Sequence, residues 1–160
     1  MIAKIVTGGD FAGVVNYILD VKKDAEILIG EGVRLKNTKS ITKSFVSQTE
    51  LNSRVTKPVG HVSLDFSIQD KAKLSNEFML KVADDYLNSM GIVNTQIVIA
   101  RHYDTEHPHI HIVYNRVSNN GKTISNKNDR YLSEKICKEL TQKYDLYFAK
   151  GKENVKIHRL

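Results

Sequence analysis

The chain contains 160 residues, of which 41% are hydrophobic and 26% are charged. This composition is typical of one globular domain and excludes a disordered, collagen-like or coiled-coil chain. The 24 lysines and arginines exceed the 18 acidic residues and give a formal net charge of +6, which favours a polyanionic partner without establishing one.

The first predicted element is a strand over residues 2–6, followed by a turn and a helix for which Asp10 is the expected N-cap. This helix is amphipathic because apolar side chains recur at helical spacing, at Phe11, Val14, Ile18 and Val21. Tyr17 lies at the border of the apolar face. The periodicity alone is also consistent with a core tyrosine whose hydroxyl reaches the surface.

The middle of the chain alternates between strands and helices. A short strand is predicted over residues 25–29, and a polar, basic helix over residues 37–54. Residues 60–66 alternate strictly, which predicts a strand with one apolar and one polar face. A long amphipathic helix is then expected from an N-cap at Asp70 to Gly91, whose lack of a side chain favours a helix end.

The last part of the chain begins with two strands, over residues 95–103 and 109–117, that are predicted to pair as a central hairpin. The first of them is apolar on both faces, as in a strand covered from both sides. A tight turn leads to a short strand over residues 122–124, and a last helix is expected over residues 129–143. The basic segment 155–159 either adds an edge strand or continues into a further region.

No apolar stretch is long enough to cross a bilayer, and the first residues lack the features of a signal peptide. We therefore expect a cytoplasmic protein with no membrane partner. Cys137 is the only cysteine, which excludes an internal disulfide. Its helix-spaced neighbours predict a small buried hydrophobic residue rather than a nucleophile.

Histidines concentrate in the predicted central hairpin. His109 and His111 are two residues apart on one strand and therefore share a face, and the turn folds His102 back beside them. Three imidazoles with one side open are typical of a catalytic metal site, and imidazole favours transition metals such as Zn, Mn, Fe, Co or Ni. Asp65 and Asp104 are the candidate carboxylates to orient the ligating rings.

Two further histidines flank this cluster. His107 lies in the turn and is expected to be exposed or to contact a ligand, although it could replace His102 as a ligand. His61 is interpreted as a partner of a ligand, a DNA contact or a plain strand residue. The alternative for the whole cluster is a polar surface strand without metal. This interpretation is the weaker one, because three imidazoles are predicted to converge on one face.

Three segments resemble a known family. Residues 101–117, with the pair His109-Ile110-His111, closely resemble the metal motif of plasmid mobilisation relaxases of the MobA/MobL type, which belong to the HUH endonucleases. Residues 11–18 look like their N-terminal motif with the nucleophilic tyrosine, and residues 57–67 are similar to their middle motif. The motifs occur in the relaxase order, with the tyrosine before the histidines.

This resemblance implies that the protein nicks and rejoins one DNA strand at an origin of transfer, in the bacterial cytoplasm. Tyr17 would attack the phosphorus and form a 5′-phosphotyrosine, while His102, His109 and His111 would hold Mg²⁺ or Mn²⁺ at the scissile phosphate. It also implies a single-stranded DNA substrate and accessory relaxosome proteins. Relatives usually run well beyond 160 residues, so we expect residues 1–160 to be one relaxase domain of a longer protein.

Basic residues near the histidines are the candidate DNA contacts. The first set borders the predicted site and comprises Arg101, Arg116, Lys122, Lys127 and Arg130. A second set comprises Lys36, Lys39, Lys43 and Arg54. For any single one of them, scattered surface charge is the simpler interpretation.

The resemblance and the periodicity together predict an α+β fold, with an antiparallel sheet covered by helices on one face and open to metal and DNA on the other. Two alternatives to a tyrosine relaxase remain. One is a metal-dependent phosphodiesterase that uses water. The other is a nucleic-acid-binding module whose histidines hold a structural metal.

Overall fold

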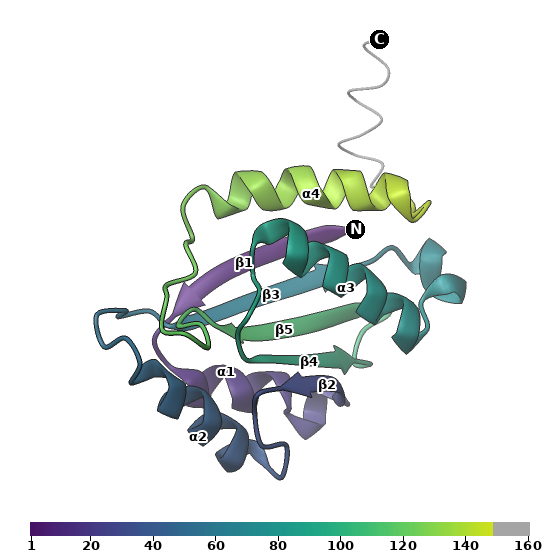
Figure 1. Cartoon of the computed structure of the whole chain (residues 1–160). Helices are drawn as coiled ribbons and strands as arrows, with labels where there is room; N and C mark the ends of the chain where they lie inside the picture. Colours follow the sequence, from purple (N-terminus) through teal and green to yellow (C-terminus); the bar gives the residue numbers. More distant parts are fainter. Residues whose placement is uncertain (149–160) are drawn as a thin grey trace.

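The computed structural model describes residues 1–148, and the predicted strand over 155–159 lies outside them. The described part forms one five-stranded sheet and four α-helices (Figure 1). The strands are β1 (Ile2–Gly8), β2 (Glu26–Glu31), β3 (Val59–Asp65), β4 (Ile97–His102) and β5 (His109–Asn115). The helices are α1 (Phe11–Ile18), α2 (Thr38–Thr49), α3 (Asn76–Met90) and α4 (Asp129–Lys143).

The sheet has the order β1-β3-β5-β4-β2, and every neighbouring pair is antiparallel. The predicted hairpin of β4 and β5 therefore lies inside the sheet, as expected. The short strand predicted over residues 122–124 is reduced to a single bridge between Val117 and Thr123. The α+β class and the antiparallel sheet are confirmed.

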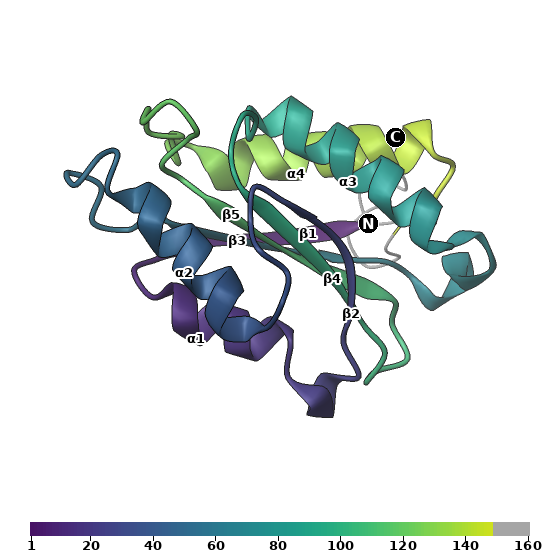
Figure 2. The same ribbon diagram turned by 60° about the horizontal axis from the view of Figure 1, so that its bottom comes forward.

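Helices cover both faces of the sheet, whereas the sequence predicted one covered face. α3 and α4 pack on one face, and α1 and α2 pack on the other (Figure 2). The physical reason is the apolar character of the second face at one end, where the strands present Val59, Val98, Ala100 and Val113 to Phe11 and Phe45. The rest of that face carries the histidines.

Two predicted helix starts differ from those in the structure. Asp70 does not cap α3; it is 5% exposed and accepts the backbone N–H of Tyr147. Ser75 caps α3 instead, through its hydroxyl and the N–H of Phe78, and Gly91 ends the helix at a φ of 76° as predicted. Asp10 occupies the N-cap position of α1 but makes no side-chain capping hydrogen bond.

The packing around the sheet contains close backbone approaches. The ring of Tyr114 lies directly over Gly60 on the neighbouring strand, in the space that a Cβ atom would need.

Cys137 is buried as predicted, and burial raises the pKa of its thiol to about 11. Within residues 1–148, no helix has both the length and the apolarity that a membrane span requires.

Candidate active site

The strand register places the three predicted ligand histidines together. His102 is directly opposite His109 in the β4–β5 pair, and His111 follows on the same face of β5. One ring nitrogen from each of the three lies within 4.8 Å of the others. The structure therefore brings the three imidazoles together, as the two-residue period of a strand predicts.

Hydrogen bonds leave one ring nitrogen free on His102 and on His109. The Nε2 of His102 lies 2.7 Å from the carbonyl oxygen of Ile18, and the Nδ1 of His109 lies 3.0 Å from the carbonyl oxygen of His107. A carbonyl only accepts, so each of these nitrogens donates and the other carries a lone pair. The Nδ1 of His102 is buried without a hydrogen-bond partner, which is costly unless a ligand occupies it.

The third ring is hydrogen-bonded to another imidazole, and it has the same arrangement in the tautomer whose Nδ1 donates to that ring. The Nδ1 of His111 lies 2.8 Å from the Nε2 of His61, whose strand is next to β5. Burial and the neighbouring His102 and His61 lower the pKa of His111 to about 3, so this imidazole is neutral at pH 7. Neutral rings with an oriented free nitrogen are what a divalent ion requires, so the donor set fits a metal.

Tyr17 lies over the histidines at the end of α1. Its ring centroid is 5.7 Å from that of His111 and 6.4 Å from that of His102. The side chain is 47% exposed, so it is not the core residue that the periodicity left open. The next residue, Ile18, is fully buried and its carbonyl oxygen holds His102, which fixes this end of α1 against the site.

Lys23 is a site residue that the sequence analysis missed. Its Nζ lies 5.2 Å from the ring centroid of Tyr17 and 3.8 Å from the carboxylate of Asp104. The same carboxylate lies 3.9 Å from the Nε2 of His109. Lys23 reaches the site through a 3-10 turn after α1, Val21–Lys23, and no periodic pattern in the sequence indicates the direction of such a turn.

The other predicted neighbours of the histidines are placed differently. Asp65 is opposite His109 in the β3–β5 register, but within residues 1–148 no hydrogen bond or ion pair is found between it and a histidine. The side chain of His107 is exposed, and this residue acts through its carbonyl oxygen. Lys4 was missed: the β1–β3 register puts it opposite Ser63 on the histidine face.

Two of the predicted DNA contacts, Arg101 and Arg116, form hydrogen bonds within the protein. Arg101 points to the opposite face, where its guanidinium donates to the carbonyl oxygen of Leu74 and the amide oxygen of Asn76. Arg116 is 8% exposed and donates to the carbonyl oxygens of Lys57 and Ile124. Neither side chain is directed at the histidines.

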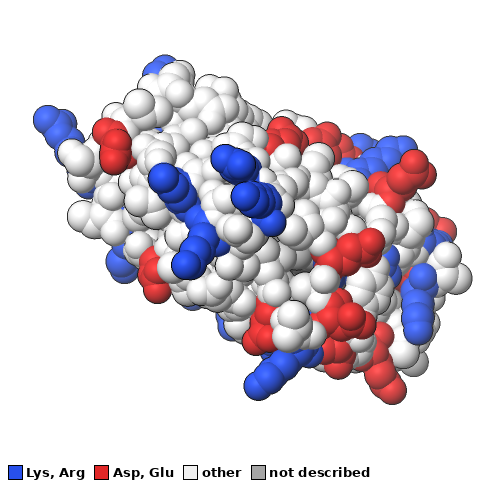
Figure 3. Space-filling view, turned by 90° about the horizontal axis from the view of Figure 1, so that it is seen from below, with Lys and Arg blue, Asp and Glu red and all other residues white. Residues whose placement is uncertain are grey.

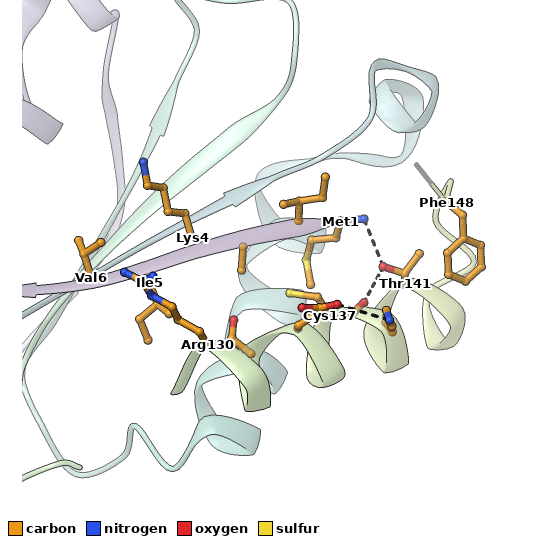
Figure 4. Close-up of a pocket in the computed structure, with 13 residues that line it drawn as sticks. Met1, Lys4, Ile5, Val6, Arg130, Cys137, Thr141 and Phe148 are labelled. Carbon is orange, nitrogen blue, oxygen red and sulfur yellow. Dashed lines mark hydrogen bonds and ion pairs between the residues drawn. The ribbon is translucent and has the colours of Figure 1, made fainter. Parts of the chain in front are cut away.

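The remaining three predicted contacts are exposed but lie away from the cluster. Lys122 and Lys127 follow β5, whose last residue is about 20 Å along the strand from His109. Arg130 lines a groove of about 600 Å³ between β1 and α4, while Lys4 points away from α4 (Figure 4). In the described part of the chain, Lys4 and Lys23 are basic side chains on the histidine side of the sheet.

A family model described as "Relaxase: MobA/VirD2-like, nuclease domain" matches residues 17–146, a span that begins at Tyr17 and includes all the histidines discussed above. No curated protein matches the sequence significantly.

Proposed function

Because the chain belongs to the MobA/VirD2-like nuclease domain family of relaxases, we propose that it nicks and rejoins one DNA strand at an origin of transfer by tyrosine transesterification. The activity serves mobilisation of a plasmid or another mobile element. The observation that carries this proposal is the position of the Tyr17 ring, 5.7 Å from His111 and half-exposed beside the three imidazoles.

In the proposed reaction, Tyr17 is the nucleophile. Its phenolic oxygen forms a bond to phosphorus and gives up its proton, while the bond from phosphorus to the 3′ oxygen breaks and that oxygen takes up a proton. The products are a 5′-phosphotyrosine and a free 3′-hydroxyl. One phosphoester replaces another, so the step is reversible, as strand rejoining requires.

We propose His102, His109 and His111 as the ligands of Mg²⁺ or Mn²⁺. When bound, the ion supplies positive charge for the oxygens of the scissile phosphate. The carbonyl oxygens of Ile18 and His107 orient two of these rings. The carboxylate of Asp104 faces the Nε2 of His109, which is the nitrogen left free for the ion, so Asp104 is proposed as a charged neighbour of the bound ion.

Lys23 supports the same interpretation. Its ammonium group lies near the Tyr17 ring, where it would contact a phosphate oxygen brought to the phenol and offset the negative charge of the substrate. Its ion pair with Asp104 keeps the side chain at the site in the absence of DNA. Lys23 is thus proposed as a substrate-binding residue.

The proposal is tested with single-stranded oligonucleotides that tile the element carrying the gene, incubated with Mn²⁺ or Mg²⁺. We expect one oligonucleotide to be cut at one position, with part of the protein shifted in a denaturing gel by the attached DNA. Tyr17→Phe should abolish both products. Cutting that survives Tyr17→Phe without an adduct would instead establish hydrolysis by water.

A further inference from the structure

A second feature of the Tyr17 helix is a shallow groove between α1 and α2, with a volume of about 480 Å³. Apolar atoms, including those of Ala12 and Val46, form most of its exposed lining, and polar groups stand among them. Six of its lining residues carry hydrogen-bonding or charged side chains: Asn16, Thr38, Lys39, Thr42, Lys43 and Ser47. It contains no aromatic side chain.

The charge of this groove is not balanced. Neither α1 nor α2 contains an acidic residue. Lys39 and Lys43 are one helical turn apart, both are exposed, and in the described part of the chain no salt bridge involves either of them. Like charges at this spacing repel each other and slightly destabilise a helix. A bound polyanion would remove that repulsion.

The view from the side of α1 and α2 shows how the charges are distributed. A group of lysine and arginine side chains lies without acidic neighbours in the middle of the left half of this face, whereas the right half mixes acidic and basic side chains (Figure 3). The face as a whole is therefore mixed in charge, with one locally basic area away from most of its acidic side chains.

The groove leads to the proposed nucleophile. Asn16 lines it, and Tyr17 is the next residue on the same helix. Successive side chains on a helix diverge by about 100°, so Asn16 is directed into the groove while Tyr17 is directed at the histidines. A bound polyanionic strand that leaves the groove at Asn16 thus arrives beside the phenol of Tyr17.

We propose that this groove binds the sugar–phosphate backbone of single-stranded DNA next to the scissile phosphate, an inference that rests on the proposed nicking function. Ammonium, hydroxyl and amide groups are donors that suit phosphate oxygens. Because no aromatic ring is present for base stacking, the groove adds affinity without reading sequence. The recognition of a nick sequence is therefore left to other parts of the protein.

The test compares the wild-type chain with a Lys39→Ala/Lys43→Ala double variant. Its matched control is Lys81→Ala/Lys135→Ala, which removes the same charge from exposed positions on α3 and α4, on the other side of the sheet. Binding of a fluorescent oligo-dT and of the cut oligonucleotide is measured by anisotropy without added metal, at several salt concentrations.

We expect Lys39→Ala/Lys43→Ala to weaken binding of both oligonucleotides by roughly 10- to 25-fold at about 0.1 M salt, and to reduce the slope of log affinity against log salt by about 1.4. The control variant should bind as the wild type does. Equal losses in the two variants, or an unchanged slope in the groove variant, would overturn the inference.

The outcome separates the groove from the nicking reaction. If the wild type binds through the groove but never forms a covalent adduct, the proposed function fails and the groove stands as a binding site for single-stranded DNA. If the wild type forms the adduct and Lys39→Ala/Lys43→Ala binds and nicks equally well, the groove proposal fails and the function stands.

Discussion

The ring of Tyr17 stands nearly perpendicular to the ring of His111, at an angle of 85° and with 5.7 Å between their centroids. The two residues come from α1 and β5, which are far apart in the sequence and meet only in the folded structure. Ile18 fixes this relationship, because its side chain is buried and its carbonyl oxygen accepts a hydrogen bond from His102. The helix that carries the phenol and the strands that carry the imidazoles therefore form one unit.

The ligand set predicts the effect of removing one imidazole. His109→Ala or His111→Ala should lower the affinity for Mn²⁺ by more than about 100-fold, since loss of a ligand exceeds the effect of losing an orienting group. Isothermal titration calorimetry with the metal alone measures this directly. His107→Ala is the control, because the His107 side chain is exposed and only its backbone contacts His109. If His107→Ala bound Mn²⁺ as weakly as His109→Ala and His111→Ala do, the assignment of the metal ligands would be contradicted.

His61 should act through His111 rather than on the metal. Its Nε2 is hydrogen-bonded to the Nδ1 of His111, so His61→Ala removes an orienting partner and should lower Mn²⁺ affinity by about 10- to 100-fold. His61→Gln keeps a polar group at this position and should recover part of the loss. If His61→Ala bound Mn²⁺ like the wild type, the bond between the two rings would have no part in metal binding.

The metal-free protein should lose stability as the pH falls. The folded chain keeps His111 neutral because burial and the neighbouring histidines lower its pKa to about 3, whereas the unfolded chain takes up this proton below about pH 6.5. The unfolded state thus binds more protons. The stability that the neutral His111 contributes is therefore complete above about pH 6.5 and is lost progressively toward pH 3.

Urea unfolding in the presence of a chelator, at about pH 7.5 and about pH 5, measures this dependence. The free energy of unfolding should be lower at the acidic pH, and His111→Ala should show a smaller difference between the two conditions. A higher free energy of unfolding for the wild type at the acidic pH would contradict this prediction.

The approach of Tyr114 to Gly60 predicts a specific cost in the sheet. A Cβ atom at Gly60 would overlap the Tyr114 ring, so Gly60→Ala should lower the free energy of unfolding by about 1–3 kcal/mol through overpacking. Gly8→Ala is the matched control, because nothing lies within 4 Å of a Cβ built there. Chemical denaturation of the two variants should therefore give clearly different midpoints.

The histidine cluster could be predicted from the sequence because a strand has a period of two residues. His109 and His111 share a face in any antiparallel sheet, and a short turn returns the chain beside them at His102. The resemblance to relaxases supplied Tyr17, which helical periodicity left between a core and a surface role. These inferences need only local geometry and a motif.

The rest of the site depends on tertiary contacts that no local pattern encodes. Lys23 reaches Tyr17 through an irregular turn, and Lys4 joins the histidine face only because β1 pairs with β3 in a particular register. Arg101 and Arg116 are close to the histidines in sequence. Their guanidinium groups nevertheless point away from the histidines, because they donate hydrogen bonds to backbone carbonyl groups in other parts of the fold. The second helical layer was missed although residues 95–103 are apolar on both faces, which is the pattern of a strand covered twice.

Peptide mapping of the covalent product tests the central claim most directly. After reaction with the cut oligonucleotide and Mn²⁺, the protein is digested with nuclease and trypsin and analysed by mass spectrometry. The peptide of residues 5–22 contains Tyr17 as its only tyrosine, and we predict that it carries a nucleotide through a 5′-phosphate. A nucleotide on any other peptide, or cut DNA with every tyrosine unmodified, would contradict the account.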